Sequence, residues 1–181
     1  MTTVVWRAAI FLEERSLVVT TYLEMLSPGQ LRPKRCADGR LQIRERAQGD
    51  WRFNRDLYFA VGADWAWTDK RHWTKEQWQE YALAPELETF AGFCGDMLAG
   101  YYELRQDSEG GVEIAYFGLL PAFIGAGWGG ALLTDAIERS WRMTAAINRV
   151  WVHTCTRDHP RALANYQARG MVIYRVEEEA Q

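Results

Sequence analysis

The first third of the chain alternates apolar segments with polar connections. Residues 17–25 are rich in β-branched and aromatic side chains, which predicts a strand. Residues 27–50 carry prolines, glycines and many charges, so we expect a loop there. Apolar residues then recur at helical spacing from Phe53 to Val61 and stop at Gly62, which predicts a helix.

A second short helix is expected after an aromatic-rich connection. Thr74 and Gln77 have the spacing of a capping box, in which each residue's side chain bonds to the other's backbone at a helix start. A helix that begins there would place Trp78, Tyr81 and Ala82 on its inner face.

From residue 87 onward the pattern changes to strands and then to alternating helices and strands. Gly95–Asp96 separates two apolar runs, at 87–94 and 97–105, which is typical of a β-hairpin. After a turn at 107–111, residues 112–120 are almost fully apolar, as expected of a strand buried on both faces. A glycine-rich turn follows, and then a helix of about 18 residues whose apolar face carries Leu132, Leu133, Ile137, Trp141 and Ala145. The last elements are a strand at 148–156, a helix at 159–169 and a strand at 171–178. In the helix at 159–169, Pro160 lies in the first turn and Gly170 follows the end.

The expected order of elements is therefore β-α-α-β-β-β-α-β-α-β. It predicts an α/β (α+β) fold with a mixed central sheet flanked by helices. The chain has 181 residues, of which 48% are hydrophobic, so we expect one domain over residues 1–181 with a substantial core.

Composition narrows the class of protein. The formal net charge is −3 and no long basic block is present, so nucleic acid is not an expected partner. The three cysteines have no CxxC spacing and no Cys/His cluster, which indicates neither a metal site nor a disulfide framework. The apolar stretch at residues 4–12 is interrupted by Arg7 and is too short to span a membrane, so we expect no membrane partner and a cytoplasmic location.

The most informative segment is the glycine-rich turn between the apolar strand and the long helix. Gly125, Gly127, Gly129 and Gly130 let the backbone turn tightly and approach a ligand. The first amides of a helix have no internal acceptor, and the helix dipole adds about half a positive charge there, so a phosphate is a natural occupant. The alternative is that these glycines only permit close packing of helix and strand.

Two other phosphate-binding motifs do not fit this turn. A Walker loop needs a Lys followed by Ser or Thr, whereas Gly130 is followed by Ala131. A dinucleotide-binding fingerprint needs an acidic residue on the next strand, and residues 149–156 contain none. A nucleotide-binding protein is therefore not expected.

The same turn resembles the acyl-CoA signature of the GNAT superfamily of N-acetyltransferases. That signature reads Arg/Gln-x-x-Gly-x-Gly/Ala, and residues 124–129 occupy it. Residues 162–171 resemble the last helix of the superfamily, with Tyr166 and Gly170 matching and Met171 where Phe is usual. The resemblance is specific over residues 87–176, and it implies an acetyl-CoA-dependent transferase that acetylates a primary amine, on a small molecule or a peptide N-terminus, by direct transfer.

The resemblance also implies roles for individual residues. The strand before the turn would pair with the pantetheine arm, backbone amides would bind the pyrophosphate, and Tyr166 would protonate the departing thiolate. His159 stands where the superfamily often has an Asn that contacts the coenzyme. The implied coenzyme-binding residues are Phe117, Gly118, Leu119, Leu120, Ile124, Gly125, Ala126, Gly127, Trp128, Gly129, Gly130 and His159.

One departure from the signature has a consequence for charge. Ile124 replaces the usual Arg or Gln, so the loop offers backbone donors and no cationic side chain. We therefore expect amides to dominate the pyrophosphate contact and a cation near the 3′-phosphate to come from elsewhere, with Arg161 as the candidate. The oligomeric state is left open, although homodimers are common in the superfamily.

The reaction needs a base, because an amine with a pKa of about 10.4 is neutral in only about one molecule in a thousand at pH 7. Glu113 is the first candidate, because some superfamily members have a catalytic Glu at this point of the strand. The alternative is a strand-end carboxylate opposite Arg105 without a catalytic role. Glu103 and His153 are the other candidates for the base.

The dense aromatic segment at residues 58–78 is a candidate acceptor site. Its rings could form a wall that binds an ammonium group through cation–π contacts. The alternative is that they pack the two N-terminal helices onto the sheet. The expected substrate-binding residues are Tyr58, Trp65, Trp67 and Glu103.

An alternative function for the whole chain is that of a sensor that binds acyl-CoA without turnover.

Overall fold

Seven strands form one mixed sheet in the computed structural model, which describes residues 17–36, 39–45, 50–65 and 67–180. The order across the sheet is β2-β3-β4-β5-β6-β1-β7. Strands β5 and β6 run parallel, and the other neighbouring strands of the described chain are antiparallel. The strands are β1 (Leu17–Met25), β2 (Leu41–Glu45), β3 (Leu87–Cys94), β4 (Met97–Gln106), β5 (Gly111–Leu119), β6 (Arg149–Cys155) and β7 (Val172–Ala180).

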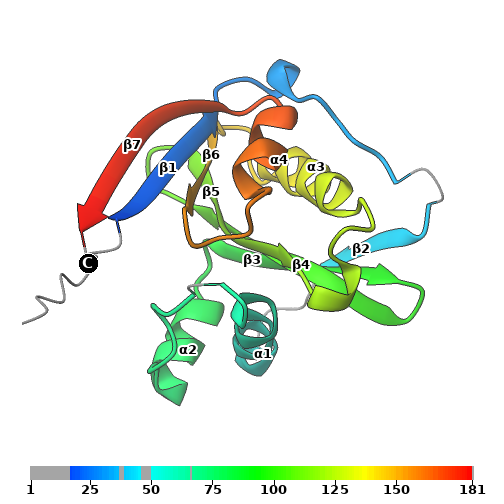
Figure 1. Cartoon of the computed structure of the whole chain (residues 1–181), viewed down its shortest axis with the longest axis vertical. Coiled ribbons are helices and arrows are strands. Elements are labelled where there is room, and N and C mark those ends of the chain that lie inside the picture. The colour runs from blue at the N-terminus through cyan, green and yellow to red at the C-terminus, as the bar shows by residue number, and fades with distance from the viewer. Residues whose placement is uncertain (1–16, 37–38, 46–49, 66, 181) are drawn as a thin grey trace, which may run out of the picture.

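Helices cover both faces of the sheet (Figure 1). Helices α1 (Trp51–Gly62) and α2 (Lys75–Ala82) lie on one face, and α3 (Gly129–Ser140) and α4 (Ala162–Ala168) lie on the other. Within the described ranges, no helix is long and apolar enough to cross a membrane. The apolar stretch at 4–12 considered above lies outside the described residues.

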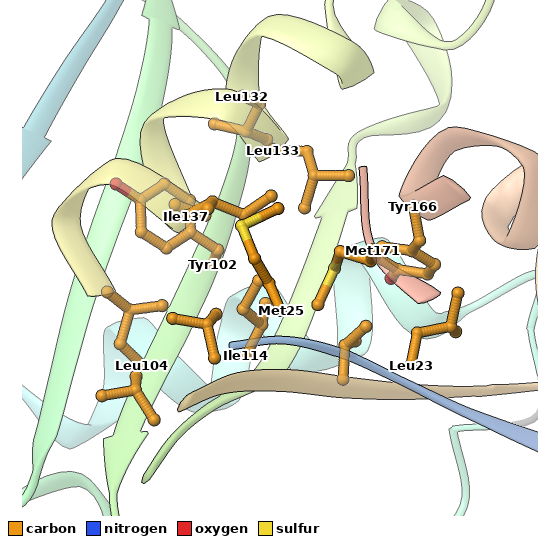
Figure 2. Close-up of a cluster of buried hydrophobic side chains, with 14 of the residues drawn as sticks. Leu23, Met25, Tyr102, Leu104, Ile114, Leu132, Leu133, Ile137, Tyr166 and Met171 are labelled. Carbon is orange, nitrogen blue, oxygen red and sulfur yellow. The ribbon is translucent and has the colours of Figure 1, made fainter. Parts of the chain in front are cut away.

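The main core lies between the sheet and helices α3 and α4. Figure 2 shows how side chains from α3 and α4 meet those of the strands in this core. The helical period of α3 puts its apolar residues on one face, and the strands contribute side chains that point to the same layer. The labelled members of this cluster are Leu23, Met25, Tyr102, Leu104, Ile114, Leu132, Leu133, Ile137, Tyr166 and Met171.

A second, mainly aromatic core packs α1 and α2 against the opposite face. Trp51, Tyr58 and Trp78 are buried there, and Trp67, Trp73, Tyr81 and Tyr116 pack around them. Much of the aromatic segment that the sequence offered as a candidate acceptor wall is therefore also structural, because its rings hold the two helices on the sheet.

The sequence-based prediction of the fold is confirmed in class and in the order of its ten predicted elements. The predicted capping box is also present: the Thr74 N–H donates to Gln77 Oε1 at 2.8 Å, and the Gln77 N–H donates to Thr74 Oγ1 at 3.3 Å. Gly170 follows α4 with a φ of +96°, which is the left-handed end that glycine favours.

The prediction that residues 27–50 form a loop was wrong in part, because β2 lies within them. Strand β2 is an edge strand that pairs with β3. Leu41 and Ile43 alternate with polar residues and point toward Gly92, whose missing side chain leaves room for both. This alternation over five residues is the local signal that could have identified the strand.

Both C-terminal helices are shorter than predicted. Helix α3 ends at Ser140, because the next amides bond three residues back: Arg142 N–H donates to the Arg139 carbonyl at 2.8 Å, and Met143 N–H donates to the Ser140 carbonyl at 3.4 Å. Helix α4 begins at Ala162, so Pro160 precedes it rather than lying in its first turn.

The turn before α4 has a side-chain cause. The Asp158 carboxylate accepts hydrogen bonds from the Thr154 hydroxyl, at 2.7 Å, and from the Cys155 N–H, at 2.9 Å. These bonds from the Asp158 side chain back to the end of β6 close the turn that separates β6 from α4.

Candidate active site

The parallel strands β5 and β6 pair over a short distance and then separate. Their register ends where Glu113 lies opposite Trp151, although both strands continue. Beyond that point β5 remains paired with β4, as far as Leu119 opposite Gly100. The separation explains why Ala115–Leu119 are only half-buried, whereas the sequence predicted a strand buried on both faces throughout.

The gap between the two strands opens into a cleft with a volume of about 980 Å³. Its walls come from β5, β6, the glycine-rich turn, α4 and the loop between α1 and α2. A strand edge without a partner strand inside a cleft can bind an extended ligand through its backbone groups. The geometry therefore fits a long, narrow ligand that runs between the strands.

Most of the residues expected to bind a coenzyme line this cleft, and four do not. Gly118, Leu120, Ala126 and Trp128 are not part of the lining. Gly118 lies against Val61 of α1, and the Leu120 N–H donates to the Ala99 carbonyl at 2.9 Å. The lining includes Phe117, Leu119, Ile124, Gly125, Gly127, Gly129, Gly130 and His159.

The glycine-rich turn presents a row of backbone donors. Gly125 and Gly127 have φ values of +87° and +84°, the left-handed region in which glycine is favoured. The amides on either side of the row are paired: Ile124 N–H donates to the Pro121 carbonyl at 3.2 Å, and Ala131 N–H donates to the Trp128 carbonyl at 3.0 Å. Within the part of the chain that the structure describes, the amides of residues 125–130 have no acceptor.

Two cationic side chains that the sequence analysis missed lie beside this turn. Lys34 and Arg169 both line the cleft, and both approach the place that a side chain at Gly130 would occupy. Arg161, the cation expected from the sequence, also lines the cleft and is exposed. Lys34 lies in a segment predicted as loop, and Arg169 precedes a helix-ending glycine, so neither has a local sequence signal for this role.

Tyr166 of α4 also lines the cleft. Its ring packs edge-on against Phe117 of β5, with centroids 6.1 Å apart, and 5% of the residue is exposed. Its hydroxyl has no hydrogen-bond partner among the residues described. Burial, with the Asp158 carboxylate adding to it, raises the pKa of Tyr166 well above its ordinary value, so the phenol stays protonated and can act as a proton donor.

Glu113 lies at the point where β5 and β6 separate, and two basic side chains contact its carboxylate. Its carboxylate accepts a hydrogen bond from Arg105 across the β4–β5 pair, and its other oxygen lies 3.6 Å from Nδ1 of His153. Burial alone would raise the pKa of Glu113, but these two partners outweigh it and lower the pKa below its ordinary value. Glu113 is therefore a buried carboxylate that stays ionised at neutral pH.

His153 is the partner that faces the cleft. Its side chain is 47% exposed and its ring packs at 5.7 Å from that of Tyr22. At 3.6 Å its contact with Glu113 is too long for a good hydrogen bond, and it becomes an ion pair when the imidazole is protonated. The Glu113 carboxylate raises the pKa of His153 above its ordinary value, which makes the imidazole a stronger base.

The loop after α1 forms one wall of the cleft. Trp65 packs edge-on against His159, with ring centroids 5.1 Å apart, so the loop reaches across the cleft to the start of α4. Trp67 also lines the cleft. Tyr58 does not, because it is buried in the aromatic core and its hydroxyl donates to Asp69 at 2.9 Å.

An aromatic cage exists near this loop, and the chain's own lysine fills it. The Lys70 ammonium lies 4.1 Å, 4.4 Å and 4.9 Å from the ring centroids of Trp73, Tyr81 and Tyr116. Its charge is balanced by Asp69, whose carboxylate oxygen is 3.2 Å away. The sequence analysis proposed an ammonium-binding aromatic wall but did not anticipate that Lys70 would occupy part of it.

Glu103 is placed behind this cage rather than in the cleft. It is 1% exposed and accepts hydrogen bonds from the Tyr81 hydroxyl and, at 2.9 Å, from the Asn54 amide. Burial raises the pKa of Glu103 to about 7, although these hydrogen bonds oppose the shift. Glu103 therefore contacts the cage through Tyr81 and does not line the cleft.

Comparison with known proteins gives one family. The family model described as the acetyltransferase (GNAT) family matches residues 42–171, which is most of the chain, and confirms the resemblance drawn from the glycine-rich turn. No curated protein sequence matches the chain.

Solved structures with the same fold are numerous. A GCN5-related N-acetyltransferase from Sphaerobacter thermophilus superposes with a TM-score of 0.68 at 15% identity, over 92% of this chain and 52% of its own. An acetyltransferase from Bacillus subtilis in complex with CoA has a TM-score of 0.54 at 24% identity, over 72% of this chain and 75% of its own. An aminoglycoside acetyltransferase from an uncultured soil metagenomic sample, in complex with trehalose, has a TM-score of 0.59 at 16% identity, over 73% of this chain and 88% of its own.

These identities establish the shared fold and nothing about the substrate. The chain spans about half to two thirds of the length of several structures that cover most of it, including 52% of the Sphaerobacter protein.

Proposed function

Because the chain belongs to the GNAT acetyltransferase family, whose members use acyl-CoA for acetyl transfer, we propose that it moves an acetyl group from acetyl-CoA to a primary amine by direct transfer in the cleft between β5 and β6. The observation that carries this proposal is the row of backbone amides at residues 125–130. They have no acceptor within the described residues, and Gly125, Gly127, Gly129 and Gly130 line a cleft that is also lined by a proton donor and a base.

The site fits the coenzyme by three independent features. Donors without acceptors at the start of a helix favour a diphosphate. The edge of β5 that turns away from β4 offers backbone groups to the pantetheine arm from Phe117 onward. Arg169 has a buried Nε atom without a hydrogen-bond partner beside the turn, which an anion would satisfy. When bound, acetyl-CoA supplies the acetyl group as a thioester.

Tyr166 would be the acid of the reaction. Tyr166 lines the cleft, and its raised pKa keeps the proton on the oxygen until a stronger base forms beside it. A thiolate expelled when the C–S bond breaks is such a base. We assign Tyr166 the donation of this proton.

His153 would accept the proton that the amine loses as its nitrogen bonds to the acetyl carbon. Glu113 is the weaker candidate for this base, because Arg105 and His153 already hold its carboxylate and lower its pKa. Glu113 instead positions the imidazole and raises its pKa. The pair thus replaces the first sequence-based assignment, in which Glu113 itself was the base, with a cleft-facing histidine supported by a buried carboxylate.

The test is amine-dependent release of free thiol. The protein is incubated with acetyl-CoA and a panel of amines that includes small amines and peptide N-termini, and thiol is followed over time. Release that requires an amine, yields an N-acetylated product and falls sharply in Tyr166→Phe supports the proposal. Tight binding of CoA without turnover on any amine would instead identify a CoA-binding protein without catalysis.

A further inference from the structure

The GNAT signature normally begins with Arg or Gln, and this chain has Ile124 there. The turn itself therefore has no cationic side chain to balance the charge of a diphosphate. Two cations from distant parts of the chain, Lys34 and Arg169, lie where that charge would be needed. A Cβ added to Gly130 would lie 2.7 Å from Lys34 Cδ and even closer to Arg169 Nη1.

Lys34 also approaches the middle of the turn. Lys34 Nζ is 3.6 Å from the place of a Cβ at Gly127, whose backbone has the left-handed conformation. The ammonium of Lys34 thus lies beside Gly127, and the guanidinium of Arg169 lies beside Gly130.

Backbone contacts hold the two cations in this position. The Arg32 N–H donates to the Arg169 carbonyl at 2.9 Å, which ties the segment before β2 to the end of α4. The Lys34 N–H donates to Thr134 Oγ1 at 2.9 Å, and the same hydroxyl donates to the Gly130 carbonyl at 2.8 Å. The segment therefore runs from α4 to α3, and it presents Lys34 beside the start of α3.

Neither cation has an anionic partner in the described part of the chain. Arg169 Nε is buried and makes no hydrogen bond. A buried donor on a charged group is costly to leave without an acceptor, and two adjacent cations repel each other. Arg35, the next cation along the segment, differs because Glu138 pairs with it.

We infer that Lys34 and Arg169 replace the cation missing from the loop, and that together with the amides of residues 125–130 they bind the diphosphate of the coenzyme. This inference rests on the proposed function, because it assumes that CoA occupies the cleft. The role of Lys34 and Arg169 differs from the role that the sequence analysis expected for Arg161, which was contact with the 3′-phosphate.

Calorimetric titration with CoA and with 3′-dephospho-CoA tests the inference in the full-length protein. Lys34→Gln and Arg169→Gln should each weaken the binding of CoA by about 10- to 100-fold, the usual effect of removing a charged hydrogen-bonding partner. Arg35→Gln is the matched control, because it removes one positive charge from the same segment but not from the cleft, and it should bind CoA as the unmodified protein does.

The two ligands separate the two kinds of phosphate. If the cations bind the diphosphate, each substitution weakens CoA and 3′-dephospho-CoA by the same factor. If the loss disappears with 3′-dephospho-CoA, the cations contact the 3′-phosphate and the inference is overturned.

Thermal unfolding separates binding from folding. Loss of an unpaired cation should leave the melting temperature of the ligand-free protein unchanged or raise it, while the rise caused by CoA becomes smaller. A lower melting temperature without ligand, with an unchanged rise on adding CoA, would show a structural role and overturn the inference. Equal CoA affinity in all variants would also overturn it but leave the proposed function standing, whereas absence of CoA binding by the unmodified protein would remove both.

Discussion

Gly130 offers a sharp test of the site, because its missing side chain is what lets two cations reach the start of α3. A Cβ at this position would overlap Arg169 Nη1 and would stand 2.7 Å from Lys34 Cδ, closer than carbon atoms approach in proteins. Both neighbours are ends of flexible side chains rather than backbone. Gly130→Ala should therefore displace Arg169 and Lys34 without disturbing the fold.

The expected magnitudes differ for stability and for binding. Gly130 is the second residue of α3, where alanine is favoured over glycine by up to about 1 kcal/mol, so the free energy of unfolding should stay the same or rise slightly. Displacing one charged contact to a diphosphate costs about 1.5–3 kcal/mol, which corresponds to a 10- to 100-fold weaker binding of CoA. A variant that is at least as stable and yet binds much less tightly is an unusual combination.

Gly129→Ala is the matched control. It adds the same methyl group to the same helix start, but its Cβ would meet only Asn165 Nδ2 and Leu119 Cδ1, both at 3.8 Å, which is ordinary van der Waals contact. The GNAT signature also accepts alanine at this position. Denaturant unfolding and calorimetric titration with CoA are measured for both variants. Equal affinity of Gly130→Ala and Gly129→Ala would refute the reasoning, since the two differ only in whether the cations must move.

Three further predictions concern the chemistry and the turn. Tyr166→Phe keeps the ring packed on Phe117 and removes the proton donor, so thiol release should fall by about 10²- to 10⁴-fold while CoA affinity is retained; an unchanged rate would show that another group protonates the thiolate. Glu113→Gln removes the carboxylate that raises the pKa of His153, so that pKa falls and the acidic limb of the pH dependence of kcat/KM should move to lower pH. Complete loss of activity at every pH would instead make Glu113 the base. Gly127→Glu forces a φ of +84° on a residue with a side chain and puts a carboxylate beside the Lys34 ammonium, so CoA binding should be abolished; a folded variant with undiminished affinity in the same titration would exclude the turn as the diphosphate site.

The elements that could be predicted from the sequence are those whose signals are local. The capping box at Thr74, the glycine after α4 and the apolar run of β5 each report on a few neighbouring residues, and each appears where expected. Strand β2 was missed because its short alternation lies among prolines, glycines and charges, and because its pairing partners all belong to β3, which is distant in the sequence. The end of α3 was missed because Trp141 continues the helical period although it packs on the core from a turn.

The residues of the site divide in the same way. The turn at 125–130 and Tyr166 were predicted because they belong to motifs that lie within short segments of the chain. The change of emphasis from Glu113 to His153 depends on the contact between β5 and β6, which shows that the carboxylate is already paired. The filling of the aromatic cage by Lys70 likewise depends on how the loop after α1 folds back on Tyr81 of α2 and Tyr116 of β5.

The loss of a cation at Ile124 and the position of Lys34 and Arg169 are best understood together. A diphosphate needs positive charge nearby, but the fold does not require that this charge come from the turn. Strand β1 leads into a segment that passes α4 and α3 before β2, and the backbone bonds of Arg32 and Lys34 fix it against both helices. Lys34, carried on this segment, lies beside Gly127, and its side chain uses space that a side chain at residue 130 would occupy. Under the proposed assignment, Ile124 and Gly130 are therefore two parts of one arrangement: Ile124 leaves the turn without a charge of its own, and Gly130 leaves room for Lys34 and Arg169 to supply it.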